Sequence, residues 1–306
     1  MKQRTVLALG MFDGVHLAHR ELIQKSAAIG AEQGARTLAF TFSNHPGEVF
    51  GHSPRLLTDI EERDRLLLEA GAQAVETIPF TQEFSALTPE EFIRQLVEAY
   101  SPAAMVTGFN YTFGKQGMGT PELLYELGKQ FGFVAYRIPP VLHEGQPVSS
   151  TRIRSALEAG EIGKANAMLG RSYRLSGQVV HNLKNGRKLG FPTANLRPDP
   201  RRAIPREGVY VTECAVSQGC YLAITNVGNN PTLNGKKQSI ESHLIDFTGD
   251  LYGAELEVRF LTRIRDQRRF ASLGELKEQL ARDLNFAREF DRNGICEYRV
   301  KFPQDS

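Results

Sequence analysis

From residue 5 to about residue 140, the sequence alternates short apolar runs with amphipathic helical stretches, and this alternation constrains the fold more than any other feature. Capping boxes at residues 58–61 and 88–91 predict two helix starts, and Thr120 before Pro121 predicts a third. Such alternation is typical of βαβ units, so we expect an α/β domain with a doubly wound parallel sheet. The expected strands are residues 5–9, 37–42, 74–78, 104–107 and 133–138.

Beyond Gly170 the pattern changes to closely spaced β-rich segments with no helices between them. This spacing indicates a smaller antiparallel barrel or sandwich, and 306 residues suffice for about two domains. We therefore expect one domain at residues 1–170 and another at residues 171–306. A capping box at residues 272–275 predicts a last helix that runs to about Phe290. The expected strands are residues 173–183, 208–216, 220–227, 240–247 and 255–260.

The composition restricts the classes of protein to which this chain can belong. A formal net charge of +2 is too small to bind nucleic acid through overall charge attraction. No apolar run reaches the length of a membrane span, and residues 1–4 lead into a strand rather than a signal peptide. We expect a cytoplasmic protein with no nucleic-acid or membrane partner, and the sequence carries no signal for an oligomeric state. Cys214, Cys220 and Cys296 lack metal-ligand spacing and are expected to be reduced structural thiols.

The stretch from Gly10 to His19 lies between the first expected strand and a long helical segment. A glycine-bearing turn in this place directs backbone N–H groups and the positive end of the helix dipole into one space, which suits a phosphate. His16 and His19 are three residues apart, so we expect both rings on one face of the first helical turn, facing the same anion. No zinc-protease spacing or nearby cysteine or carboxylate cluster favours a metal. Two unrelated surface histidines are the alternative for the pair alone.

Two more loops are expected at the same edge, because ligands bind outside the carboxyl ends of the strands in open α/β sheets. Residues 41–46 follow the second expected strand and contain His45. Residues 108–114 follow the fourth and contain Asn110, whose amide suits a ribose or phosphate. An ordinary turn is the alternative for Asn110.

A second candidate anion site begins near residue 148. Ser150 and Thr151 precede an expected helix at residues 155–159, and Arg154 follows one turn on. A plain helix cap with solvated arginines is the alternative. The chain contains neither a Walker A sequence nor a Gly-x-Gly-x-x-Gly sequence, which disfavours a P-loop NTPase and a dinucleotide dehydrogenase.

Residues 186–195 stand out within the β-rich half. We expect this glycine-flanked loop to bind phosphates. The binding groups are Lys188 and the backbone amides of the loop, which includes Gly190. Thr193 and Asn195 are neutral oxygen ligands for a hard cation, and Mg²⁺ held by so few protein ligands keeps water and phosphate oxygens. A turn without a ligand is the alternative.

Glu241 is the strongest candidate for a general base in this half. It alternates with Ile240 and Ser242 in an expected strand. A carboxylate on the outer face of a strand is usually only solvated, which is the alternative here.

With these motifs assembled, the whole chain resembles the bacterial bifunctional riboflavin kinase/FAD synthetase family, in the family's order over nearly all 306 positions. There are two departures. Ala18 stands where the family usually has glycine, and residues 41–46 lack an acidic residue often seen before the His-Pro pair. The matching motifs are residues 10–16 with His19, Thr41-Phe42 with His45-Pro46, 108–114, 149–154, 190–195, 208–210, 226–228 with Pro231-Thr232, 241–247 and 251–253.

The resemblance implies a nucleotidylyltransferase-like first domain that adenylylates FMN to FAD with release of pyrophosphate. It implies a second domain that phosphorylates riboflavin to FMN. The expected partners are the small molecules ATP, riboflavin and FMN, with Mg²⁺ as the cofactor. The alternatives are an FAD synthetase with an inactive kinase-like domain and a non-catalytic flavin-nucleotide sensor.

The resemblance also implies a role for each candidate residue. The histidines would hold the ATP phosphates, and the hydroxyls and arginine near residue 150 would neutralise the departing pyrophosphate. The expected catalytic residues are His16, His19 and Glu241. The expected nucleotide-binding residues are Gly10, Phe12, Asn110, Ser150, Thr151, Arg154, Lys188 and Gly190. The expected flavin contacts are His45 and Arg265, and the expected metal ligands are Thr193 and Asn195.

Overall fold

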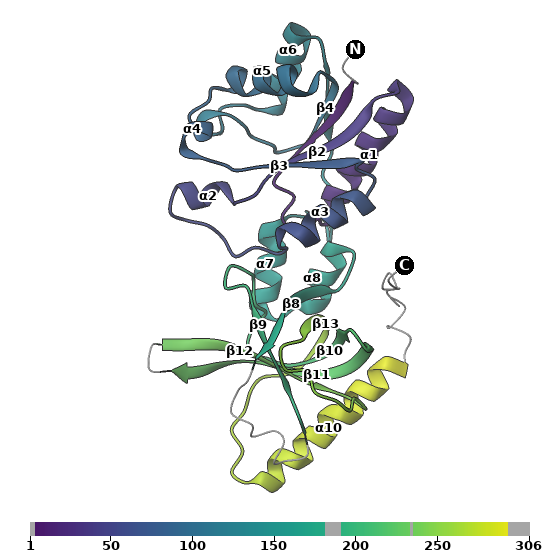
Figure 1. The fold of residues 1–306 in the computed structure, drawn as a ribbon, viewed down its shortest axis with the longest axis vertical. Coiled ribbons are helices and arrows are strands. Elements are labelled where there is room, and N and C mark those ends of the chain that lie inside the picture. Colours follow the sequence, from purple (N-terminus) through teal and green to yellow (C-terminus); the bar gives the residue numbers. More distant parts are fainter. Residues whose placement is uncertain (1–3, 181–190, 233–234, 293–306) are drawn as a thin grey trace. The chain divides into compact units, whose positions relative to one another are not determined.

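The computed structural model of the chain describes residues 4–180, 191–232 and 235–292 (Figure 1). The chain forms two compact units, which are described separately here. The first unit contains the chain up to Arg154, together with Ala167–Gly170 and Arg201–Ala203. The second contains Ser155–Asn166, Arg171–Pro200 and the chain from Ile204 onward. The two units are therefore interleaved in the sequence.

The first unit is built on a parallel five-stranded sheet with the strand order β3-β2-β1-β4-β5. Successive residues of β1 enter opposite cores: Val6 and Ala8 pack on one face, and Leu7 and Leu9 on the other. A parallel sheet buried on both faces confirms the predicted doubly wound domain, and each strand lies within two residues of its predicted bounds. The strands are β1 (Thr5–Leu9), β2 (Arg36–Phe42), β3 (Ala74–Ile78), β4 (Pro102–Gly108) and β5 (Val134–Ile138).

Helices bury the two faces of this sheet. α1 and α3 contribute Leu22, Ile23 and Leu67 to the core on one face, and α5 and α6 contribute to the core on the other. The helices of this unit are α1 (Leu17–Gln33), α2 (Pro46–Val49), α3 (Ile60–Glu69), α4 (Gln82–Ser85), α5 (Pro89–Tyr100), η1 (Lys115–Gly117) and α6 (Pro121–Phe131), and a short hairpin is formed by β6 (Leu142–His143) and β7 (Gln146–Pro147). Two further helices, α7 (Ser150–Ala159) and α8 (Ile162–Leu169), are divided between the units, because Ser155–Asn166 belong to the second.

Two of the predicted helix starts are confirmed. The Thr88 hydroxyl accepts the Glu91 N–H at 3.2 Å, and the Glu91 carboxylate accepts the Thr88 N–H at 2.8 Å, which completes the capping box of α5. The Thr120 hydroxyl caps α6 by accepting the Leu123 N–H at 3.2 Å, with Pro121 at the first helical position.

Two helix predictions in this region are wrong. The N-cap of α3 is Asp59, because the Thr58 hydroxyl is instead engaged with the Gly14 N–H at 3.1 Å. The helix expected at residues 155–159 begins at Ser150, so the hydroxyls thought to precede it form its first turn. In both cases a contact with the turn after β1, remote in the sequence, decides the boundary.

The second unit is a closed antiparallel barrel with the strand order β10-β11-β12-β9-β8-β13, which decides between the predicted barrel and sandwich. β9 was not predicted, because its sequence reads as a turn; it pairs with β8 and β12. The predicted strand at 240–247 is wrong at its end: β12 stops at Leu244. The strands are β8 (Tyr173–Val180), β9 (Ala194–Pro198), β10 (Gly208–Val216), β11 (Gly219–Thr232), β12 (Gly235–Leu244) and β13 (Glu255–Arg265).

The last helix, α10 (Leu273–Arg292), packs against this barrel, and the Ser272 hydroxyl accepts the Glu275 N–H at its start, as the capping box predicts. Ala287 is fully buried in a core cluster with Val209, Val211 and Ile224. Cys214 and Cys220 are free thiols, as expected, and Cys296 lies outside the described residues. Within the described ranges, no helix is long and apolar enough to cross a membrane.

Candidate active sites

A ligand-binding crevice is expected between β1, the central strand of the parallel sheet, and its neighbour β4. β1 and β4 are neighbours, yet the chain continues from them to opposite sides of the sheet. At such a switch point the loops that leave the carboxyl ends diverge and open a crevice. A cavity of about 810 Å³ lies there. The predicted residues that line it are Gly10, Phe12, His16, His19, His45, Asn110, Ser150, Thr151 and Arg154.

The turn after β1 is held in a strained conformation. Phe12, Gly14 and Val15 have φ angles of 53°, 84° and 37°, in the left-handed region that Phe and Val rarely adopt. Phe12 is fully buried, and a Cβ on Gly10 would lie 2.9 Å from its ring. Strain of this kind persists only where the surrounding contacts fix the chain, and it is common at functional sites.

His16 is the N-cap of α1 rather than a member of its first turn, which corrects the expected placement. Its Nδ1 accepts the backbone N–H of His19 at 3.4 Å, which assigns the ring proton to Nε2. The two imidazoles stack with centroids 3.6 Å apart and planes inclined by 15°. Both rings line the cavity at the positive end of the α1 dipole, so the pair is placed to bind one anion.

Asp13 connects this turn by hydrogen bonds to the segment before α3 and to the start of α7. Its carboxylate accepts the backbone N–H groups of Leu57 at 2.8 Å and Thr58 at 3.3 Å, and the Arg154 guanidinium at 2.8 Å. Its backbone carbonyl accepts the Ser150 hydroxyl at 2.8 Å. Burial raises the pKa of Asp13, while the two N–H donors and Arg154 oppose that shift. Asp13 is not among the predicted site residues; the available signal was an acidic residue between apolar and glycine neighbours.

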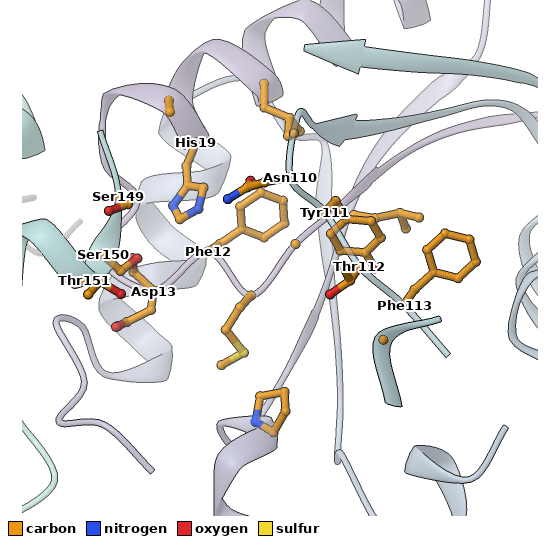
Figure 2. A pocket seen from close by; sticks show the side chains of 18 of the residues that line it. Phe12, Asp13, His19, Asn110, Tyr111, Thr112, Phe113, Ser149, Ser150 and Thr151 are labelled. Carbon is orange, nitrogen blue, oxygen red and sulfur yellow. The ribbon is translucent and has the colours of Figure 1, made fainter. Parts of the chain in front are cut away.

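The start of α7 forms the polar wall of the cavity. Figure 2 shows Ser150 and Thr151 beside Asp13, on the same side of the cavity as His19. The Arg154 guanidinium also reaches the Thr151 hydroxyl at 3.4 Å. Arg152 is engaged differently: it donates to backbone carbonyls of the β6–β7 hairpin at 2.8, 2.9 and 3.3 Å. Arg154 is thus the arginine that is held at the polar wall.

The other wall of the cavity is aromatic. Asn110 lies next to the Phe12 ring, and Tyr111 and Phe113 continue that wall away from the histidines (Figure 2). His45 caps α2, with Nδ1 accepting the Gly47 N–H at 3.0 Å. Burial lowers the pKa of His45, and the positive charge of Arg154 adds to that effect. Further aromatic side chains line the cavity: Phe42, Phe50, Phe80, Phe84, Phe92 and Phe109.

A second cavity, of about 560 Å³, lies in the barrel unit. Thr193, Glu241 and Arg265 line it, together with side chains from the segment before α10 and from α10 itself. Asn195 pairs in register with Glu241 on the adjacent strands β9 and β12, so the two side chains project from the same face of the sheet. Lys188 and Gly190 lie outside the described residues.

Arg265 is held at this cavity by a buried carboxylate. Its guanidinium donates to Asp283 on α10 at 2.7, 3.1 and 3.2 Å, and Gln279 donates to the same carboxylate at 2.7 Å. Asp283 is only 1% exposed. Paired in this way, Arg265 presents a fixed guanidinium to the cavity.

The parallel sheet with its anion-suited switch point and the barrel with its carboxylate-bearing cavity define a two-domain transferase of phosphorus-containing groups. Residues 1–152 match the FAD synthetase family, and residues 169–290 match the riboflavin kinase family. The chain belongs to the bifunctional riboflavin kinase/FMN adenylyltransferase family.

Relatives and a solved structure agree with this assignment of family and fold. The bifunctional riboflavin kinase/FMN adenylyltransferase of Bacillus subtilis (strain 168) is 34% identical over 92% of this chain and 90% of its own length. The protein of the same name from Escherichia coli (strain K12) is 37% identical over 93% and 92%. A crystal structure titled as a macrolide-efflux protein from Streptococcus pneumoniae shares the fold, with a TM-score of 0.88, 32% identity and coverage of 94% and 95%.

Proposed function

We propose that this chain converts riboflavin to FMN within residues 171–306 and FMN to FAD within residues 1–170, with ATP as the second substrate of both reactions. One observation carries the proposal. Nine residues from four separate segments, eight of them expected at the ATP and His45 expected at the flavin, line one cavity, while Thr193, Glu241 and Arg265 line another. A cytoplasmic location belongs to the same proposal.

Adenylyl transfer in the first unit requires positioning and charge neutralisation more than covalent chemistry. The FMN phosphate is already an anion, so it attacks the α-phosphorus of ATP without a protein nucleophile, and pyrophosphate leaves. The Nε2–H of His16, the His19 ring and the α1 dipole bind the ATP phosphates. Ser150, Thr151 and Arg154 neutralise charge on the departing pyrophosphate.

The two walls of this cavity suit the two substrates. Asn110, Gly10 and Phe12 lie at the end nearest the histidines, where they orient the nucleotide. The aromatic wall beyond them, with His45 at its edge, suits the flat apolar flavin ring. Because burial lowers the pKa of His45, this side chain meets the flavin as a neutral imidazole at pH 7.

Phosphoryl transfer in the barrel unit uses Glu241 as the general base. Glu241 lines the cavity and accepts the proton of the ribityl hydroxyl as that oxygen attacks the γ-phosphorus of ATP, with ADP leaving. Arg265 contacts the flavin in the same cavity. The family resemblance assigns Lys188 and Gly190, which lie outside the described residues, to the ATP phosphates.

The neutral oxygens of Thr193 and Asn195 fit a hard divalent cation that keeps water and phosphate oxygens among its ligands. Asn195 is opposite Glu241 in the strand register, so Thr193 and Asn195 would hold the cation on the strands that also carry the base. Mg²⁺ in this position supplies charge neutralisation for the ATP phosphates. Chelation by excess EDTA is expected to stop FMN formation, and added Mg²⁺ is expected to restore it. Full FMN formation after chelation would overturn the metal assignment.

The direct test is incubation of the purified chain with riboflavin, ATP and Mg²⁺, followed by chromatography. We expect FMN to appear first and FAD after it. If FAD forms only from supplied FMN, the chain is an FAD synthetase with an inactive kinase-like unit. If both flavins bind and neither product forms, it is a sensor, and the proposal is wrong.

A further inference from the structure

Arg202 is encoded within the β-rich half of the sequence, yet it belongs to the first compact unit. The Arg201 carbonyl accepts the Leu56 N–H at 2.7 Å, and the Ala203 N–H donates to the Leu56 carbonyl at 2.8 Å. Residues 201–203 therefore form a short parallel bridge with the segment that precedes α3. This bridge places the Arg202 side chain inside the unit, where only 4% of the residue is exposed.

The Arg202 guanidinium joins three groups of this neighbouring segment. It donates to the Asp59 carboxylate at 2.8 Å, to the Leu57 carbonyl at 2.7 Å and to the Glu62 carboxylate at 3.2 Å. Asp59 is the N-cap of α3, and Glu62 is only 5% exposed. A buried guanidinium is stable only when such partners are fixed, so these contacts hold the start of α3 and the chain before it in one conformation.

The segment that Arg202 contacts also binds Asp13, through the backbone N–H groups of Leu57 and Thr58. The Leu57 carbonyl and the Thr58 N–H belong to the same peptide group, so Arg202 and Asp13 hold opposite ends of one peptide. Thr58 adds a second tie, because its hydroxyl accepts the Gly14 N–H at 3.1 Å. Hydrogen bonds in series polarise and align one another. The contacts thus run without a gap from Arg202, through the 57–58 peptide and Asp13, to Arg154 at the cavity.

We propose that Arg202 is a positioning residue for adenylyl transfer: by fixing the 57–58 peptide it sets Asp13, and through Asp13 it sets Arg154 against the departing pyrophosphate. The proposal rests on the function proposed above for the first unit. It means that a residue encoded in the kinase half of the sequence completes the adenylyltransferase site.

The test is the Arg202→Lys variant of the full chain. Lysine keeps the positive charge, but its ammonium group cannot reach all three partners in the planar geometry of a guanidinium. A misplacement of Arg154 of this kind is expected to lower kcat/KM for FAD formation by about 10–100-fold. Riboflavin phosphorylation by the same sample is expected to stay at the wild-type rate, which shows that the chain is folded. Wild-type FAD formation would overturn the proposal.

Arg65→Met is the matched control. Arg65 lies on α3, the helix whose start Arg202 contacts, but its side chain is 48% exposed and pairs with Glu69 one turn away. Both activities are expected to stay unchanged in this variant. A loss of FAD formation equal to that of Arg202→Lys would show that any change near α3 has this effect, and would overturn the specific role of Arg202.

A double-mutant cycle separates positioning from a merely structural role. Arg154→Ala removes the group through which Arg202 acts, so adding Arg202→Lys to it is expected to cost no further activity. If the two losses multiply, Arg202 acts independently of Arg154 and the proposal is wrong.

Amide hydrogen exchange provides a readout that does not depend on catalysis. Arg202→Lys is expected to speed exchange at residues 13–16 and 57–62, because the shared peptide is loosened. Faster exchange confined to residues 201–203 would overturn the proposal even if the wild-type chain made no FAD. Absence of FAD formation by the wild-type chain, with exchange changed as expected, would instead overturn only the proposed function.

Discussion

The two cavities are built in opposite ways from the same chain. The cavity of the parallel sheet is assembled from loops and helix starts, with the N-terminus of α1 at the carboxyl edge of the sheet. The barrel cavity is lined by side chains that project from strands and from α10. A parallel sheet offers an anion site at its switch point, whereas the described part of the barrel cavity presents polar side chains from strands and from α10.

One device is common to both cavities. In each, a buried carboxylate holds an arginine at the wall: Asp13 holds Arg154 at 2.8 Å, and Asp283 holds Arg265 at 2.7 Å. The difference lies in what else the carboxylate does. Asp13 also binds backbone N–H groups of the segment before α3, while the second partner of Asp283 is Gln279 from its own helix. We therefore expect changes at Asp13 to disturb a loop and changes at Asp283 to disturb one side chain.

The largest expected effect comes from Glu241→Gln. Removing the general base should lower riboflavin phosphorylation by about 10²–10⁴-fold, since proton acceptance is lost while shape is kept. FAD formation from supplied FMN should be unchanged, because the first cavity contains none of the barrel residues. Chromatographic assays of both steps provide the measurement. Parallel loss of both activities would show that the two sites are not independent.

His19→Ala is expected to have the reverse selectivity. Loss of one phosphate-binding group should lower FAD formation by about 10²–10³-fold, with riboflavin phosphorylation preserved. The stacked pair predicts that His16→Ala has a comparable effect, because each ring supports the other. An unchanged FAD rate in the His19 variant would remove the histidines from the mechanism.

Asp283→Asn is expected to have a smaller effect. The amide keeps the size of the side chain but loses the charge that fixes Arg265, so KM for riboflavin should rise about tenfold with a smaller change in kcat. The matched control is Asp246→Asn, because Asp246 pairs with Arg288 in an 81% exposed position. Steady-state kinetics of FMN formation distinguish them. Equal effects of the two variants would contradict a specific role for Asp283.

The smallest expected effect is a pH dependence confined to the first site. Because burial raises the pKa of Asp13, this carboxyl takes up a proton at a higher pH than an exposed aspartate. As the pH falls, Asp13 loses its charge and Arg154 loses its partner, so FAD formation should decline on the acid side. The Asp13→Asn side chain cannot take up a proton. This variant should form FAD more slowly, and its rate should depend less on pH on the acid side of the pH–rate profile. An identical acid limb in both proteins would assign the titration to another group.

Much of the fold follows from local patterns. The five strands of the parallel sheet and the caps at Thr88 and Thr120 follow from alternation and from side chains within four residues of each other. The two errors in the predicted helix starts have a common cause: Thr58 and Ser150 both bind the turn after β1, which lies far away in the sequence. β9 was missed because its pairing with β8 and β12, rather than its own propensity, makes it a strand.

The sequence by itself determined the parallel sheet of the first unit, the antiparallel β class of the second and the family resemblance, because strand period, helix caps and motif spacing are properties of neighbouring residues. Only the tertiary structure showed that Asp13 holds Arg154, that Asp283 holds Arg265 and that Arg202 belongs to the first unit. These contacts join residues 18 to 145 positions apart. Their partners are chosen by burial and hydrogen bonding in the folded chain, which no local pattern encodes.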